Sequence, residues 1–160
     1  MAYQLERFDE NTPPLADATP IGERSMNKEE GKLIASQLMA DVSELQALMI
    51  GAGTHRVLLV LQGIDASGKD GVVRFVVSQG DPLNVKVHPF KMPTPDELAH
   101  DFLWRVHAAV PPRGYMGIFN RSHYEDVVAA YVRGTITDTM RTQRFAHIRH
   151  FEELLHDDGT

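Results

Sequence analysis

Any fold for this chain has to accommodate a glycine-bracketed loop that joins an apolar strand to a helix. Gly63 and Gly68-Lys69 enclose four residues directly after the apolar run 56–62, RVLLVLQ. A short continuous run of this kind is typical of a strand covered on both faces in a parallel sheet. Glycines let backbone N–H groups and a helix N-terminus surround an oxyanion, and Lys69 adds a full positive charge. The segment therefore predicts a phosphate-binding P loop.

The residues inside and after the loop depart from the usual P-loop pattern. Asp70 follows the lysine, where serine or threonine would normally bring a hydroxyl to magnesium. Asp65 can instead hold magnesium, directly or through water, or accept a proton from the attacking group. Ser67 can donate a hydrogen bond to a phosphate. The alternative is a tight strand-to-helix turn that uses glycines for backbone reasons alone, and Asp70 by itself fits a first-turn helix carboxylate better than a catalytic one.

Strands and helices are expected to alternate along the chain. The first expected elements are a helix at 27–49 capped by Asn27, a strand to residue 62, a helix at 69–79 and a strand at 84–88. They are followed by a helix opened by the Thr94 capping box and stopped at Pro111, a strand at 115–120, a helix ending at Gly134 and a helix at 139–156. This order predicts a P-loop kinase-like α/β fold of three layers, α/β/α, around a parallel sheet. Asp157-Asp158-Gly159-Thr160 is a helix-stop signal of the kind that precedes another strand. We expect an N-terminal arm at 1–26 and a phosphotransferase core at 27–160 that is incomplete at its C-terminus, because a three-stranded parallel sheet with this much helix is small for the class.

Composition excludes several classes of protein. The chain has no cysteine, which rules out disulfides and thiolate metal sites, and its net charge of −6 argues against a nucleic-acid partner. No apolar run looks long enough to span a bilayer, and the polar N-terminus does not resemble a signal peptide, so we expect no membrane partner and a cytoplasmic protein. The segment 56–134 is less acidic, with nine Lys/Arg and eight Asp/Glu, and can attract an anionic ligand.

The end of the third predicted strand carries a second group of candidate residues. In P-loop folds the strand beside the loop strand supplies a magnesium-binding acid at this place. Here Asn120 occupies it, which can ligate magnesium or orient a bound water, and Arg121 offers a planar fork for phosphate oxygens. Glu125 and Asp126 suit the start of the next helix.

With these segments in view, the chain resembles the polyphosphate kinase 2 family. The resemblance is carried by Gly63-Ile64-Asp65-Ala66-Ser67-Gly68-Lys69-Asp70-Gly71, by Phe90-Lys91 with 100–105 (HDFLWR), by 119–125 (FNRSHYE) and by the ending from Arg144 to Thr160. Several separated motifs in one order are more specific than one loop. The form of the 119–125 motif is similar to that of the subgroup that phosphorylates both AMP and ADP.

The resemblance implies reversible, Mg²⁺-dependent (or Mn²⁺-dependent) transfer of phosphoryl groups between inorganic polyphosphate and AMP, ADP and ATP, in a homo-oligomer. It assigns catalytic roles to Asp65, Lys69, Asn120 and Arg121, with Mg²⁺ on Asp65 and, directly or through water, on Asn120. Phosphate or nucleotide binding is assigned to Gly63, Ala66, Ser67, Gly68, Lys69, Asp70, Gly71, Lys91, Arg121 and Glu125. It also implies a strand and an arginine-bearing lid helix beyond Thr160.

Other charged and ring side chains have ordinary alternatives. Lys86, Lys91, Arg105, Arg113 and Arg133 are candidates for lining a polyanion channel, with Lys91 the strongest and surface ion pairs the alternative for the others. His123 can touch a ligand or simply begin a helix. His147 and His150 share a helix face, but no third metal ligand is evident. Phe102 and Trp104 fit core packing better than base stacking.

Two rival functions remain at this stage. One is an ATP-dependent small-molecule kinase with a P loop. The other is a non-catalytic fragment that binds nucleotide or polyphosphate and forms oligomers.

Overall fold

A computed structural model describes residues 27–160, so the predicted arm at 1–26 lies outside the described residues. The chain divides into two units, Met1–Ala35 and Ser36–Thr160. Within the first, residues 27–35 form the opening turns of a helix, where Asn27 Oδ1 accepts a hydrogen bond from Glu30 N at 2.8 Å. The prediction that Asn27 caps this helix is therefore confirmed. All strands of the described residues belong to the second unit.

The elements follow the predicted order with small shifts at their ends. They are α1 (Lys28–Ala52), β1 (Val57–Leu61), α2 (Lys69–Gln79), η2 (Pro82–Asn84), β2 (Val85–Pro89), α3 (Pro95–Leu98), α4 (Trp104–Ala109), β3 (Met116–Asn120), η3 (His123–Asp126), α5 (Val128–Val132) and α6 (Asp138–Asp157). The capping box at Thr94 is present, with Glu97 as its reciprocal partner. The predicted stop after the last helix is also confirmed, because Gly159 takes a φ of 80°.

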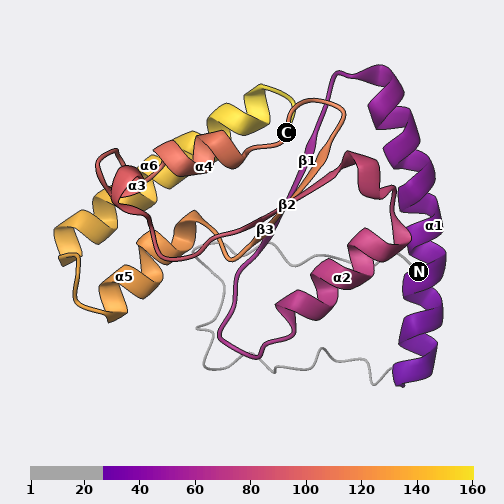
Figure 1. The fold of residues 1–160 in the computed structure, drawn as a ribbon, viewed down its shortest axis with the longest axis horizontal. Coiled ribbons are helices and arrows are strands. Elements are labelled where there is room, and N and C mark those ends of the chain that lie inside the picture. The colour runs from indigo at the N-terminus through magenta and orange to yellow at the C-terminus, as the bar shows by residue number, and fades with distance from the viewer. Residues whose placement is uncertain (1–26) are drawn as a thin grey trace, which may run out of the picture. The chain divides into compact units, whose positions relative to one another are not determined.

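The three strands form one parallel sheet in the order β1-β3-β2. The last strand in sequence is thus the central one, and it pairs with β1 from Val57↔Met116 to Leu61↔Asn120 and with β2 in the same register. In Figure 1, α2 lies on one side of the sheet and α4 and α6 lie on the other. This is the predicted α/β/α layering, and all three strands end at the same edge.

The core lies between the sheet and the helices α4 and α6. Its buried members are Phe90, Val106, Phe119, Phe151 and Leu155. Phe90 and Phe119 meet edge-on with ring centroids 4.8 Å apart. Ile118 and Phe119 point to opposite faces of β3 and are both fully buried, as a strand covered on both sides requires.

Two predicted helices are broken into shorter pieces. The helix expected from Thr94 to Pro111 is interrupted between α3 and α4, where Asp101 Oδ1 accepts a hydrogen bond from Leu103 N at 3.0 Å. An aspartate that bonds backbone two residues ahead offers a turn that competes with the helix. The helix expected before Gly134 likewise begins as η3, capped by Ser122, and continues as α5.

Helix α1 departs from the sequence expectation about membranes. Residues Glu29–Ala52 are long and apolar enough to cross a bilayer by length and composition, with a mean hydropathy of 1.2 over the best window. The expectation that no run reaches this length was therefore wrong. A single helix of this kind near an N-terminus is weak evidence for a membrane, because helices of soluble proteins meet the same criterion.

Candidate functional site

The loop after β1 has the backbone that its glycines predict. Gly68 caps α2 with a φ of 90°, a conformation that side chains disfavour. At Gly63 an added Cβ would lie 2.8 Å from Ser67 Oγ, so a larger residue here would make the Ser67 side chain move. Ala66 also has a positive φ, 60°, without being glycine. The loop is thus curled tightly in front of the N-terminus of α2.

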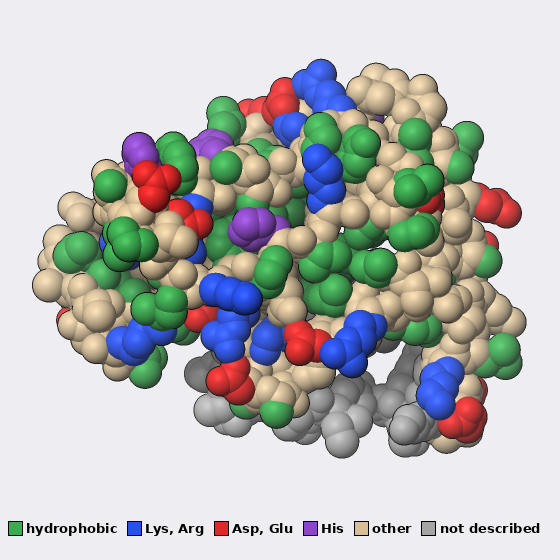
Figure 2. Space-filling model, in the orientation of Figure 1, with side chains coloured by type: hydrophobic (Ala, Val, Ile, Leu, Met, Phe, Trp, Pro, Cys, Tyr) green, Lys and Arg blue, Asp and Glu red, His purple; other side chains and the backbone are tan. Residues whose placement is uncertain are grey.

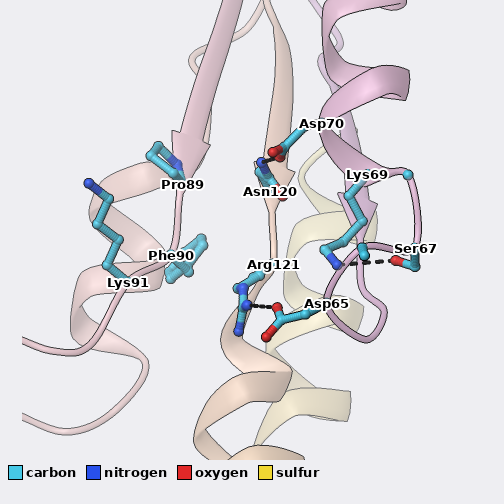
Figure 3. A pocket seen from close by; sticks show the side chains of 11 residues that line it. Asp65, Ser67, Lys69, Asp70, Pro89, Phe90, Lys91, Asn120 and Arg121 are labelled. Carbon is cyan, nitrogen blue, oxygen red and sulfur yellow. Dashed lines mark hydrogen bonds and ion pairs between the residues drawn. The ribbon is translucent and has the colours of Figure 1, made fainter.

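Lys69 folds back over this loop. Its Nζ donates hydrogen bonds to Gly63 O at 2.8 Å, to Ile64 O at 2.6 Å and to Ser67 Oγ at 3.1 Å. The ammonium group therefore lies within the curve of the loop, in the place where a phosphate-binding lysine is needed. Figure 3 shows Lys69 and Ser67 pointing toward one another.

The end of β3 brings the second motif to the same place. Because Leu61 pairs with Asn120, the residues after both strands meet at one edge. Asn120 Nδ2 donates a hydrogen bond to Asp70 Oδ1 at 2.7 Å, and the Arg121 guanidinium forms an ion pair with Asp65. Figure 3 shows the two side chains of each pair pointing toward one another. The four predicted catalytic residues are therefore neighbours, although about 55 positions separate the two motifs.

A cavity of about 430 Å³ joins these side chains. Its lining consists of Asp65, Ala66, Ser67, Gly68, Lys69, Asp70, Pro89, Phe90, Lys91, Asn120 and Arg121. The lining holds three cations, Lys69, Lys91 and Arg121, against two carboxylates, so it is weakly basic in an acidic protein. Lys91 follows β2 and lies on the other side of Phe90 from the loop (Figure 3). Figure 2 shows basic and acidic side chains gathered together in the lower middle of the molecule, where the loop lies in Figure 1.

Three predicted binding residues do not line this cavity. They are Gly63, Gly71 and Glu125. Glu125 instead lines a neighbouring cavity of about 320 Å³, to which Arg121 also contributes. The Glu125 carboxylate accepts hydrogen bonds from Gln62 Nε2 at 2.7 Å and from Arg121 at 3.4 Å. Sequence reasoning had not singled out Gln62, because a glutamine at a strand end carries no signal until its partner is known.

Most of the other basic residues predicted to line a polyanion channel form ion pairs or contact aromatic rings. Arg105 is buried, pairs with Asp126 at 2.7 Å and bonds the carbonyl of Lys91 at 2.9 Å. Arg113 pairs with Asp158 at 2.6 Å, and Lys86 lies over the ring of Tyr115. Arg133 lines a second cavity of about 320 Å³ that shares Lys91 and Arg121 with the first. Arg105 also lines this second cavity, but its guanidinium already has Asp126 as a partner.

The His123 side chain is part of the protein interior and does not face the cavity beside the phosphate loop. Its ring is 1% exposed, and Nε2 lies 3.3 Å from Glu152 Oε1. Tyr124 donates a second hydrogen bond to that oxygen at 2.8 Å. The hydrogen bond from His123 keeps the pKa of Glu152 below its ordinary range, while burial raises the pKa of Tyr124 to about 12. These contacts join η3 to α6.

The oxygen atoms around the cavity suit a hard divalent cation. Magnesium is commonly held by one or two carboxylates together with waters and substrate phosphates. Asp65, Asp70 and the amide oxygen of Asn120 supply oxygens beside the phosphate loop, and the Asp65 side chain is 88% exposed. Within residues 27–160 no three His, Cys, Asp or Glu side chains converge on one point. Two carboxylates and one amide oxygen fit a cation that takes its other ligands from water and phosphate.

The parallel sheet, the curled loop with its lysine and the arginine at the end of the neighbouring strand define a P-loop kinase-type fold. The family profile of polyphosphate kinase 2 (PPK2) matches residues 25–160. This chain belongs to the polyphosphate kinase 2 family, as the resemblance had indicated.

Individual relatives agree with the family match. The AMP/ADP-polyphosphate phosphotransferase of Meiothermus ruber is 46% identical over 162 residues, which cover 99% of this chain and 56% of the relative. The ADP-polyphosphate phosphotransferase of Rhodopseudomonas palustris is 40% identical over 74% of this chain and 45% of its own length. A crystal structure of polyphosphate kinase 2 from Arthrobacter aurescens superposes with a TM-score of 0.91 at 37% identity, covering 96% of this chain and 56% of the other. The chain thus spans about half the length of these relatives.

Proposed function

We propose that this chain carries out reversible, Mg²⁺-dependent phosphoryl transfer between inorganic polyphosphate and adenine nucleotides, converting AMP to ADP and ADP to ATP. The observation that carries the proposal is the single cavity in which Lys69, Lys91 and Arg121 come together from three parts of the chain. Polyphosphate and nucleotides are both chains of phosphates, so a cavity with several separated cations can hold donor and acceptor together. The names of the relatives point to the same substrates.

The reaction requires an in-line displacement at phosphorus. A terminal oxygen of the acceptor nucleotide forms a bond to the end phosphorus of polyphosphate, and the bond from that phosphorus to the next bridging oxygen breaks. The shortened polyphosphate leaves with the electron pair. Loop N–H groups and Lys69 hold one phosphate chain, and Arg121 stabilises the charge on the transferring group. Catalysis then comes from positioning and electrostatics, without a covalent enzyme intermediate.

Magnesium, or manganese in its place, would be held by Asp65 with help from Asp70 and Asn120. When bound, the cation neutralises charge on the phosphate oxygens of donor and acceptor. Arg121 would have to leave Asp65 when phosphate binds, because the same carboxylate serves the guanidinium in this structure. Two phosphate oxygens can accept hydrogen bonds from the guanidinium fork as a carboxylate does, so Arg121 keeps a charged partner after this exchange.

The test is nucleotide formation from polyphosphate, MgCl₂ and either AMP or ADP, followed by chromatography. We expect ADP or ATP from this chain, and a loss of at least roughly a hundredfold in Lys69→Ala and in Asp65→Asn, the scale of removing one key electrostatic group. Lys32→Ala, at an exposed lysine of α1 that pairs with Glu29, is the matched control and should keep the rate. Near-normal rates in either site variant would contradict the assignment.

The same assay separates the rival functions. An ATP-dependent small-molecule kinase would form no ATP from polyphosphate and ADP alone. A binding and assembly fragment would bind tripolyphosphate without turnover, and the coverage of about half of each relative's length favours this as the second candidate.

A further inference from the structure

The turn that carries Arg121 needs support from outside itself. Arg121 has a φ of 61°, a region that non-glycine residues rarely occupy and that persists where the surroundings fix it. The backbone contributes one contact, from Arg121 N to Leu61 O at 3.0 Å. The next residue, Ser122, is fully buried and caps η3 by accepting a hydrogen bond from Tyr124 N. Side chains must supply the rest of the support.

Gln62 supports the Arg121 turn with both ends of its side-chain amide. Its Nε2 donates to Glu125 Oε1 at 2.7 Å, and its Oε1 accepts from Ser122 Oγ at 3.0 Å. A carboxylate can only accept, so the nitrogen end of the amide has to face Glu125. The other Glu125 oxygen accepts from Arg121 at 3.4 Å. Gln62 follows β1 as Arg121 follows β3, so this side-chain bridge continues the strand pairing past the end of the ladder.

We propose that Gln62 is a positioning residue that holds Ser122 and Glu125, and through them directs the Arg121 guanidinium toward the phosphate loop. Gln62 does not line the cavity, so it acts through its partners and not on substrate. In this arrangement Glu125, which lines the neighbouring cavity with Arg121, orients the arginine through the contact at 3.4 Å. The proposal rests on the proposed function, because that function places Arg121 on phosphate.

The proposal is tested by exchanging the side chains at positions 62 and 125, which changes the pairing of hydrogen-bond donors and acceptors. In Glu125→Gln alone, an amide nitrogen would face the Arg121 guanidinium, and in Gln62→Glu alone, two carboxylates would oppose each other. In the double variant Gln62→Glu/Glu125→Gln every donor again meets an acceptor and the net charge is unchanged. Gln62→Met removes both hydrogen bonds. Gln79→Met is the matched control, because Gln79 is exposed at the end of α2 and its side chain makes no hydrogen bond within residues 27–160.

The readout is the affinity of the chain for inorganic tripolyphosphate with MgCl₂ by calorimetry, beside thermal unfolding of each variant. Each single variant at positions 62 and 125 should bind roughly tenfold more weakly, the scale of one or two lost hydrogen bonds. The double variant should recover to within about threefold of the wild type, which independent losses would not allow. The control should bind and unfold as the wild type does. Every variant should remain folded at the assay temperature, although Gln62→Met lowers the melting temperature because the buried Ser122 hydroxyl loses its acceptor.

Three results would overturn the proposal: normal binding by Gln62→Met, no recovery in the double variant, or no tripolyphosphate binding by the wild type. A direct role of Glu125 on substrate or metal predicts the second of these. The failure of the proposed function looks different. In that case the wild type binds tripolyphosphate with the expected dependence on Gln62 but forms no ADP or ATP from polyphosphate.

Discussion

Two residues in the site occupy backbone conformations that L-amino acids avoid. Ala66 in the phosphate loop and Arg121 at the end of β3 have φ values of 60° and 61°. Such conformations cost on the order of 1–3 kcal/mol each and tend to persist at functional sites. Both residues line the same cavity. The strain is therefore concentrated where the backbone has to present loop amides and the guanidinium to one ligand.

This strain can be measured with two substitutions at one position. Arg121→Gly and Arg121→Ala both remove the guanidinium and its pairs with Asp65 and Glu125, but only glycine adopts a positive φ without a steric cost. We expect Arg121→Gly to be at least as stable as Arg121→Ala, and more stable by about 0.5–1 kcal/mol in urea unfolding. A clearly more stable alanine variant would show that the turn is not strained.

At the scale of elements, the central strand depends on a close approach. Gly117 of β3 faces Pro111, and a Cβ at Gly117 would lie 2.7 Å from Pro111 Cγ and 2.8 Å from Cδ. A proline ring cannot rotate away, so the strand or the segment before it would have to shift. Gly117 thus sets how closely the chain before β3 packs on the sheet whose edge carries the site.

We therefore expect Gly117→Ala to lower the free energy of unfolding by about 1–3 kcal/mol, the usual cost of overpacking a tight core. Gly51→Ala is the matched control, because nothing lies within 4 Å of a Cβ built there, inside α1. It should be neutral or slightly stabilising, since alanine favours helix. Equal effects at the two positions in urea denaturation would refute the packing argument.

The link between η3 and α6 should make stability depend on pH at the acid end. The folded-state pKa of Glu152 is lowered, first by the hydrogen bond from His123. A carboxyl group with a lowered pKa stabilises the fold above its unfolded-state pKa, and this contribution is lost as the pH falls through the folded-state value.

Glu152→Gln should accordingly be less stable than the wild type at neutral pH, by about 0.5 kcal/mol because the side chain is half exposed. The difference should shrink below pH 4, where the wild type also loses its carboxylate. Urea unfolding at pH 7 and pH 3 measures both values. A gap that stays constant between these pH values would mean that the Glu152 charge does not contribute.

At the scale of the whole molecule, the site is shared by parts of the chain that meet only in the folded state. The loop follows β1, Asn120 ends β3 with Arg121 next to it, and Lys91 follows β2. A ligand that binds all three should bind the folded chain and not the unfolded one. Binding free energy then adds to the free energy of unfolding.

Tripolyphosphate with Mg²⁺ should therefore raise the melting temperature in a concentration-dependent manner, with about 2.7 kcal/mol of added stability at a hundred times the dissociation constant. Lys69→Ala should remove most of this shift. Thermal unfolding at several tripolyphosphate concentrations measures the effect. A shift that persists unchanged in Lys69→Ala would place the binding somewhere other than the loop.

Local chemistry made much of this protein readable from its sequence. The P loop needed only the apolar run, the glycines and Lys69, because backbone freedom and charge act over a few residues. The caps at Asn27 and Thr94 and the stop at Gly159 were confirmed for the same reason. The two breaks, near Asp101 and at Val127 between η3 and α5, were missed. At Asp101 a side chain competes for the backbone, which is hard to weigh against helix periodicity.

Tertiary structure decided what depends on register. Only strand order places the last strand between the first two, and only that order brings Asn120 beside Asp70 and Arg121 beside Asp65. The bridge from Gln62 to Ser122 and Glu125 spans about sixty residues of sequence, and a glutamine gains such a meaning only from its partners. The sequence alone determined the phosphate loop and the family motifs. The parallel pairing of the strands decided which side chains contact one another at the phosphate loop. Hydrogen bonds between residues distant in sequence form only after the strands are in register.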